Sequence, residues 1–214
     1  MESTGTERTI RPQGEPCATP DTQLGQFYFD FIDPGSYVVS HMIDGAGAEE
    51  SFGWFGLELR PPPAPMVDSR DPSWRSRHSE ALRLARPLGL SMAEAEFLPW
   101  TRKAHELCGF ARDRDRFHQV RRALFRAHFV DRIDIGRIDL LTELAHEAGL
   151  ERSETRAALD VDRYAEALVS TRESALDREI RVVPTLVTAA LRLAGTGALR
   201  EIQHLLAGGI ANGE

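Results

Sequence analysis

The chain has 214 residues, a net charge of −7 and a hydrophobic content of 42%. This length fits one domain, or one domain with a large insertion, and the acidic balance argues against nucleic acid or an anionic membrane as the main partner. No apolar run is long enough to cross a bilayer and no secretory leader is visible at the start, so we expect a cytoplasmic protein without a membrane partner.

The first two structured segments are predicted to be a strand and a helix joined by a tight turn. Residues 1–24 are rich in Thr, Pro, Glu and Gly, which predicts a flexible N-terminal tail. Residues 27–32 are aromatic and β-branched and predict a strand. Asp33 and Pro34 then favour a helix start, because Asp accepts amide hydrogens of the first turn and Pro fits the first helical position. The helix is expected over residues 35–46.

The rest of the chain divides into a strand, a long helical block and a closing hairpin with a helix. Alternating apolar residues predict a second strand over residues 52–60, and the prolines of 61–65 predict an extended linker. Helical periodicity fills the following block, including a helix over residues 93–110. Residues 182–188 predict a strand, 191–194 its hairpin partner, and 198–207 a closing amphipathic helix.

This order, β-α-β, a helical block and β-β-α, predicts an α/β fold interrupted by an all-helical insertion. The main domain is expected to combine residues 25–65 with residues 181–210, and the insertion to span residues 66–180.

The two cysteines, Cys17 and Cys108, are predicted to be unpaired thiols. Their spacing is not that of a metal site, and no pair of histidines has the His-Glu-x-x-His arrangement. We therefore expect no metal.

Four segments of the chain resemble one known family. They are the turn Asp33-Pro34-Gly35-Ser36 followed by Tyr37, residues 54–62, residues 98–105, and Val183-Pro184-Thr185. In this order they resemble the DsbA family of thioredoxin-fold proteins, in the branch that holds FrnE-like oxidoreductases and 2-hydroxychromene-2-carboxylate isomerases. The resemblance covers residues 26–207 and implies a thioredoxin-like fold in which a cis-proline loop at Pro184 faces the turn.

The turn is also where the chain departs from that family. Oxidoreductase members carry Cys-Pro-x-Cys and isomerase members Ser-Pro-Tyr, whereas this chain has Asp33 at the first position and Ser36 at the fourth. Dithiol exchange needs a thiolate nucleophile and a resolving thiol, and both are missing from the turn. We therefore predict a degenerate active site.

Our leading hypothesis is a DsbA-family, oxidoreductase-like protein that binds a small molecule or a thiol-bearing ligand in the groove between the two parts of the fold. Asp33, at a helix N-terminus, is expected to remain ionised and to accept a proton, with Ser36 as the second catalytic candidate. The ligand-binding candidates are Pro34, Tyr37, Trp100, Arg102, His105, Val183 and Pro184.

Other hypotheses remain open on the sequence alone. In a glutathione-dependent isomerase, Ser36 would act on the thiol of glutathione or another low-molecular-weight thiol, and Val183 would offer backbone groups to this cofactor. In a non-catalytic interaction protein, which includes a homodimer, Asp33 is only a helix cap. Tyr37 and Trp100 then pack between the two parts of the fold.

Overall fold

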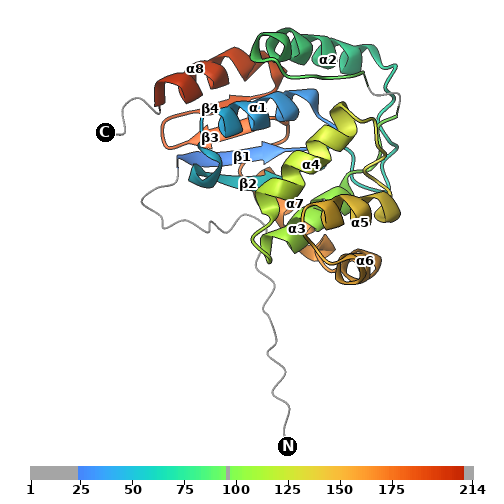
Figure 1. The fold of residues 1–214 in the computed structure, drawn as a ribbon. Coiled ribbons are helices and arrows are strands. Elements are labelled where there is room, and N and C mark those ends of the chain that lie inside the picture. Colours follow the sequence, from blue (N-terminus) through green and yellow to red (C-terminus); the bar gives the residue numbers. More distant parts are fainter. Residues whose placement is uncertain (1–23, 95–96, 210–214) are drawn as a thin grey trace, which may run out of the picture.

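The computed structural model describes residues 24–94 and 97–209, and its centre is a four-stranded mixed sheet with the strand order β2-β1-β3-β4 (Figure 1). The strands are β1 (Gly25–Phe29), β2 (Phe52–Gly56), β3 (Thr185–Thr188) and β4 (Arg192–Ala194). β1 pairs with β2 in parallel and with β3 in antiparallel orientation, and β3 and β4 form the predicted hairpin. Most of the predicted tail lies outside the described residues.

The two faces of the sheet follow from the alternation along β1. Phe27 and Phe29 point to one face, where both rings pack edge-on against Trp54. Tyr28 points to the other face and stacks on Phe55. Each face therefore carries an apolar surface that must be covered by helices.

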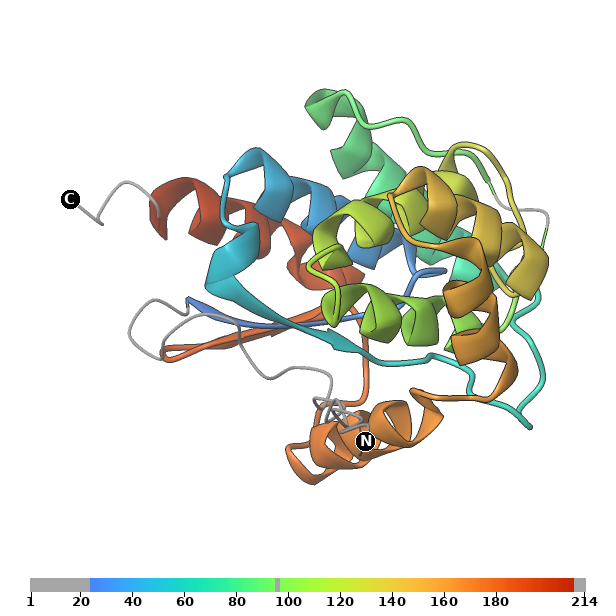
Figure 2. The ribbon, with the colours of Figure 1, turned by 60° about the horizontal axis from the view of Figure 1, so that its bottom comes forward.

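Helices cover both faces, as Figure 2 shows, with the sheet seen nearly edge-on. α1 (Pro34–Gly45), α2 (Pro72–Ala85) and α8 (Leu199–Gly209) pack together on the side of Phe27 and Phe29. α7 (Ala165–Asp177) covers the opposite side, where Ala175 joins the cluster around Tyr28. The remaining helices, α3 (Arg102–Arg112), α4 (Phe117–Phe129), α5 (Ile138–Glu147) and α6 (Arg152–Asp160), form a group beside the sheet. Short 3-10 turns are η2 (Glu49–Ser51), η3 (Arg86–Leu88) and η4 (Thr196–Ala198).

Several predicted element boundaries were wrong, including the start of β3, which begins at Thr185 rather than at residue 182. β1 ends at Phe29 rather than at residue 32, and β2 ends at Gly56 rather than at residue 60. The helix expected over residues 93–110 starts only at Arg102. Pro99 disfavours helical conformation in the residue before it, and residues 97–101 lie outside any helix or strand.

The element order agrees with the predicted α/β arrangement, with α2 to α7 between β2 and β3. α2 belongs to the segment predicted as insertion, and it packs mainly against α1, with smaller contacts to η4 and α8. Within the described part of the chain, no helix is long and apolar enough to span a bilayer.

Candidate functional site

The turn at the start of α1 is fully buried and satisfies its own polar groups. Asp33 is the N-cap of α1: its Oδ2 accepts hydrogen bonds from the Ser36 amide at 2.6 Å and from the Ser36 hydroxyl at 2.7 Å. Both side chains have an exposed fraction of 0%. The Ser36 amide in the first helical turn thus has a carboxylate partner, as the sequence predicts.

Arg77 of α2 is the residue that the sequence analysis missed. Its Nη2 donates to Asp33 Oδ1 at 2.6 Å and to the backbone carbonyl of Val183 at 2.8 Å. One guanidinium therefore joins the start of α1 to the loop before β3. The side chain is 30% exposed, and its Nε is buried without a hydrogen-bond partner. The sequence shows only an arginine on a helix, so nothing in it points to this contact.

The loop before β3 lies directly against the turn. The Val183–Pro184 peptide bond is cis. A Cβ built on Gly35 would lie 2.8 Å from Pro184 Cδ, so a side chain at this position would displace the loop. Asp33, Gly35, Val183 and Pro184 come together, as the resemblance implies.

Burial and pairing act in opposite directions on Asp33. Burial raises the pKa of its carboxyl above the ordinary value, while the Arg77 charge and the hydrogen bonds from Ser36 and Arg77 lower it. The net direction is upward, which makes Asp33 easier to protonate than an exposed aspartate. A carboxyl of this kind is suited to exchanging a proton with a bound molecule.

His105 is connected to the turn through a second buried carboxylate. His105 Nε2 lies 3.3 Å from Asp30 Oδ1, and Asp30 Oδ2 accepts from the Leu59 amide at 2.6 Å. The Asp30 amide in turn donates to Ser36 Oγ at 3.3 Å. His105 thus lies in the interior and is linked to the turn through Asp30.

Three of the predicted ligand-binding residues lie apart from the turn. Tyr37 stacks on Phe129, with ring centroids 4.8 Å apart, and its side chain faces α4. Arg102 forms an ion pair with Glu58 at 3.1 Å. Trp100 is 41% exposed and donates from Nε1 to the Ala64 carbonyl. The structure therefore brings together Asp33, Pro34, Ser36, Val183 and Pro184, and joins His105 to them.

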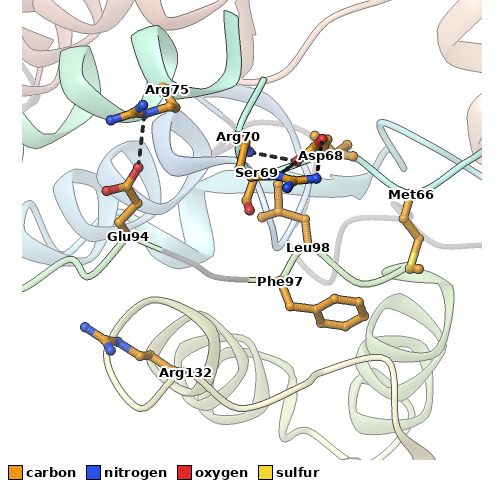
Figure 3. Close-up of a pocket in the computed structure, with 10 residues that line it drawn as sticks. Met66, Asp68, Ser69, Arg70, Arg75, Glu94, Phe97, Leu98 and Arg132 are labelled. Carbon is orange, nitrogen blue, oxygen red and sulfur yellow. Dashed lines mark hydrogen bonds and ion pairs between the residues drawn. The ribbon is translucent and has the colours of Figure 1, made fainter. Parts of the chain in front are cut away.

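A cavity of about 760 Å³ lies beside this site, between the linker after β2, the start of α2 and the segment before α3 (Figure 3). We call it the linker cavity. Met66, Phe97 and Leu98 provide apolar walls, and Arg75 and Glu94 form an ion pair at 3.5 Å across its rim. Leu98 also packs in one cluster with Ile32 and Trp74.

The remaining chemistry of the described residues is limited. Cys108 is fully buried in α3, and burial raises the pKa of its thiol to about 12, so it is a poor nucleophile. Cys17 lies outside the described residues. Across residues 24–94 and 97–209, no group of three or more histidine, cysteine or carboxylate side chains is arranged to hold a metal ion.

The sequence matches one protein family over almost all of the described chain. The family is that of the DSBA-like thioredoxin domain, and the match spans residues 26–207. The uncharacterized protein YwbO of Bacillus subtilis is 29% identical over 167 residues, which cover 75% of this chain and 84% of YwbO.

Solved structures share the fold at low sequence identity. A probable DsbA oxidoreductase from Streptomyces coelicolor has a TM-score of 0.70 at 21% identity, covering 89% of this chain and 91% of its own. A 2-hydroxychromene-2-carboxylate isomerase has a TM-score of 0.71 at 16% identity. The match covers 86% of this chain and 94% of the isomerase chain. The cytosolic disulfide reductase DsbM of Pseudomonas aeruginosa, solved with GSH, has a TM-score of 0.62 at 16% identity. The match covers 87% of this chain and 98% of the DsbM chain. The predicted thioredoxin-like α/β fold is confirmed.

Proposed function

This chain belongs to the family of DSBA-like thioredoxin domains, and from this premise we propose that it binds a small acidic or thiol-bearing molecule beside the Asp33–Ser36 turn and does not exchange disulfides there. The turn holds a carboxylate and a hydroxyl where dithiol exchange needs two sulfurs. The one cysteine among the described residues is buried in α3.

The observation that carries this proposal is the position of Arg77. Its guanidinium lies at the N-terminal end of α1 and against the carbonyl of Val183, where it adds a positive charge to the positive end of the helix dipole. A buried Nε without a partner leaves one donor of this guanidinium unused. Because this Nε is buried, an anionic group meets the exposed part of the Arg77 side chain, which is 30% exposed, and finds a cation there.

Glutathione and related low-molecular-weight thiols are the ligands that we would test first. They carry carboxylates as well as a thiol, and the DsbM structure with GSH shows that a protein of this fold was solved with such a compound. Ser36 donates its hydroxyl proton to Asp33, so a thiol-activating, isomerase-like role for Ser36 would require this bond to open.

A non-catalytic interaction protein is the second candidate. It is favoured by the closure of the turn, because Asp33 and Ser36 are fully buried and bonded to one another. On this hypothesis Arg77 only fixes α2 onto α1, and the turn takes no ligand. A homodimer would be one form of such a protein.

A thermal-shift screen with glutathione, S-methylglutathione, coenzyme A and small carboxylates distinguishes ligand binding at the turn from a non-catalytic interaction protein. A ligand at a hundredfold excess over its dissociation constant stabilises the fold by about 2.7 kcal/mol, which raises Tm by roughly 5 to 10 °C for a chain of this size. S-methylglutathione separates the contribution of the carboxylates from that of the thiol.

The matched variants are Arg77→Gln and Arg83→Gln, which remove one arginine each from α2. Arg83 is exposed and serves as the control. The proposal predicts a shift that is kept in Arg83→Gln and lost in Arg77→Gln, and also lost in the charge-preserving Arg77→Lys if the planar fork is needed. A screen without any shift, or a shift that Arg77→Gln and Arg77→Lys both leave intact, would support the interaction protein instead.

A further inference from the structure

A second cavity lies on the flank of α1, away from the turn. Its volume is about 370 Å³, and it is open to solvent and lined by α1, α4, the residue after α4 and the segment after η3. We call it the α1–α4 cavity. Its size falls within the range of small-molecule sites. Neither Arg77 nor any residue of the Asp33–Ser36 turn lines it.

One part of the cavity wall is apolar and aromatic. Tyr37 and Phe125 stack on each other with ring centroids 5.6 Å apart, and Leu90 and Val130 complete this part of the wall. Tyr37 is held in place by stacking on Phe129 and by its hydroxyl, which donates to the Ser91 carbonyl at 3.3 Å. Tyr37 is 9% and Phe125 1% exposed, so these rings offer a ligand only a small apolar area, and the half-buried Leu90 and Val130 extend it.

The charged part of the wall has an excess of positive charge. Arg122 and Arg126 line the cavity, and the carboxylate among the lining residues is Asp44. Asp44 is already neutralised, because the fully buried Arg121 pairs with both of its oxygens.

The two lining arginines are held only weakly by carboxylates of the chain. Arg122 Nη1 lies 3.8 Å from Asp44 and 4.0 Å from Glu49, distances beyond a direct hydrogen bond. Arg126 pairs with Asp131 at 3.2 Å, but its side chain is 72% exposed, so water screens this pair. Both guanidinium groups are thus available to a ligand at little cost.

From this arrangement we propose that the α1–α4 cavity is a second binding site, for a small organic anion with a flat apolar body, such as an aromatic carboxylate. The body lies against Leu90, Val130 and the small exposed part of Tyr37, and the carboxylate pairs with Arg122 and Arg126. The site is independent of the proposed ligand at the turn, since the two share only helix α1.

The test uses 2-naphthoate as the probe and the uncharged 2-naphthalenemethanol as its matched control, with the full chain. Calorimetry is expected to detect 2-naphthoate in the micromolar to millimolar range and to find the alcohol weaker by about tenfold or more, because it cannot pair with the arginines. Intermolecular nuclear Overhauser effects to the methyl groups of Leu90 and Val130 are expected to locate the bound ring.

Variants separate this site from the turn. The double variant Arg122→Gln/Arg126→Gln, at two exposed positions, is expected to lose the preference for the anion, whereas the control Arg83→Gln, also at an exposed position, keeps it. Absence of 2-naphthoate binding overturns the proposal, and so does equal binding of acid and alcohol. Binding that is lost in Arg77→Gln but kept in the double variant also overturns it, because the probe then lies at the turn.

Discussion

The Asp33–Ser36 turn and the α1–α4 cavity lie on the same helix but hold their charges in opposite ways. At the turn, Asp33 has an exposed fraction of 0% and pairs with Arg77 at 2.6 Å. At the cavity, the Arg122 and Arg126 side chains are 46% and 72% exposed and their carboxylate partners lie on the surface or are shared. A buried pair fixes the fold and is costly to break, whereas exposed cations exchange their partners readily.

This difference has a consequence for recognition. A ligand at the turn must compete with Asp33 for Arg77, while a ligand at the α1–α4 cavity competes mainly with water. The family resemblance directs attention to the turn, and the geometry adds a more open site on the other flank of α1.

The largest expected effect comes from breaking the buried pair. Arg77→Gln leaves Asp33 buried without its cation and is expected to lower the free energy of unfolding by about 2 to 4 kcal/mol. This loss is smaller than for a fully buried ion pair, because the Arg77 side chain is 30% exposed. Urea unfolding measures this cost. Arg83→Gln, on the exposed part of the same helix, is expected to change the free energy of unfolding little.

A partial rescue by Asp33→Asn in the Arg77→Gln background would show that the loss arises from the unpaired carboxylate. If Arg77→Gln is as stable as the parent protein, the buried ion pair does not hold the turn.

The second effect is a loss of stability in mild acid, caused by the buried His128 and the half-buried His118 of α4. Burial lowers the pKa of His128 from 6.5 to about 4, and burial together with Arg121, Arg122 and Arg112 lowers that of His118 to about 3. Below pH 6.5 these two histidines therefore bind more protons in the unfolded chain than in the folded one, and their contribution to stability falls as the pH falls.

For His128, which is buried, the slope is expected to be about 1.4 kcal/mol per pH unit between its unfolded and folded pKa values. Urea midpoints measured at several pH values through this window, in the parent and in His128→Gln, check it. An unfolding free energy that stays constant through the window would contradict the burial of a neutral imidazole at this position.

A smaller effect is expected where His105 meets the sheet. A Cβ on Gly56 would lie 2.3 Å from His105 Nδ1, so Gly56→Ala forces the His105 ring to move. We expect this substitution to lower the free energy of unfolding by about 1 to 3 kcal/mol. Gly45→Ala is the matched control, since a Cβ there meets nothing within 4 Å. Thermal unfolding of both variants tests whether the packing of His105 is as tight as described.

The smallest expected effect is the absence of a reaction. Cys108 in a Cys17→Ala background should not react with a thiol reagent such as Ellman's reagent in the native protein, because the thiol is buried and its pKa is raised to about 12. It should react at once in denaturant. Rapid native labelling would mean that α3 opens readily or that the thiol is accessible.

The sequence predicted those parts of the site that depend on local signals and strand order. Asp33 as a helix cap follows from the Asp-Pro pair, and the meeting of Asp33 with Val183 follows from a strand order implied by the resemblance. Arg77 could not be predicted, because its role depends on how α2 packs across α1. Trp100 and Arg102 were predicted to line the groove because of their residue types. The hydrogen bond of Trp100 to Ala64 and the ion pair of Arg102 with Glu58 depend instead on the path of the linker.

The central claim is that the turn keeps the backbone geometry of a DsbA-like protein while its chemistry has changed from a dithiol to a carboxylate–arginine pair. The most direct test is reduction of insulin disulfides by dithiothreitol, with the parent protein, the Cys17→Ala/Cys108→Ala variant and the Asp33→Cys/Ser36→Cys variant. We expect the first two to show only the background rate and the third to exceed it. Catalysed reduction by the parent protein that survives loss of Cys17 and Cys108 would contradict the account.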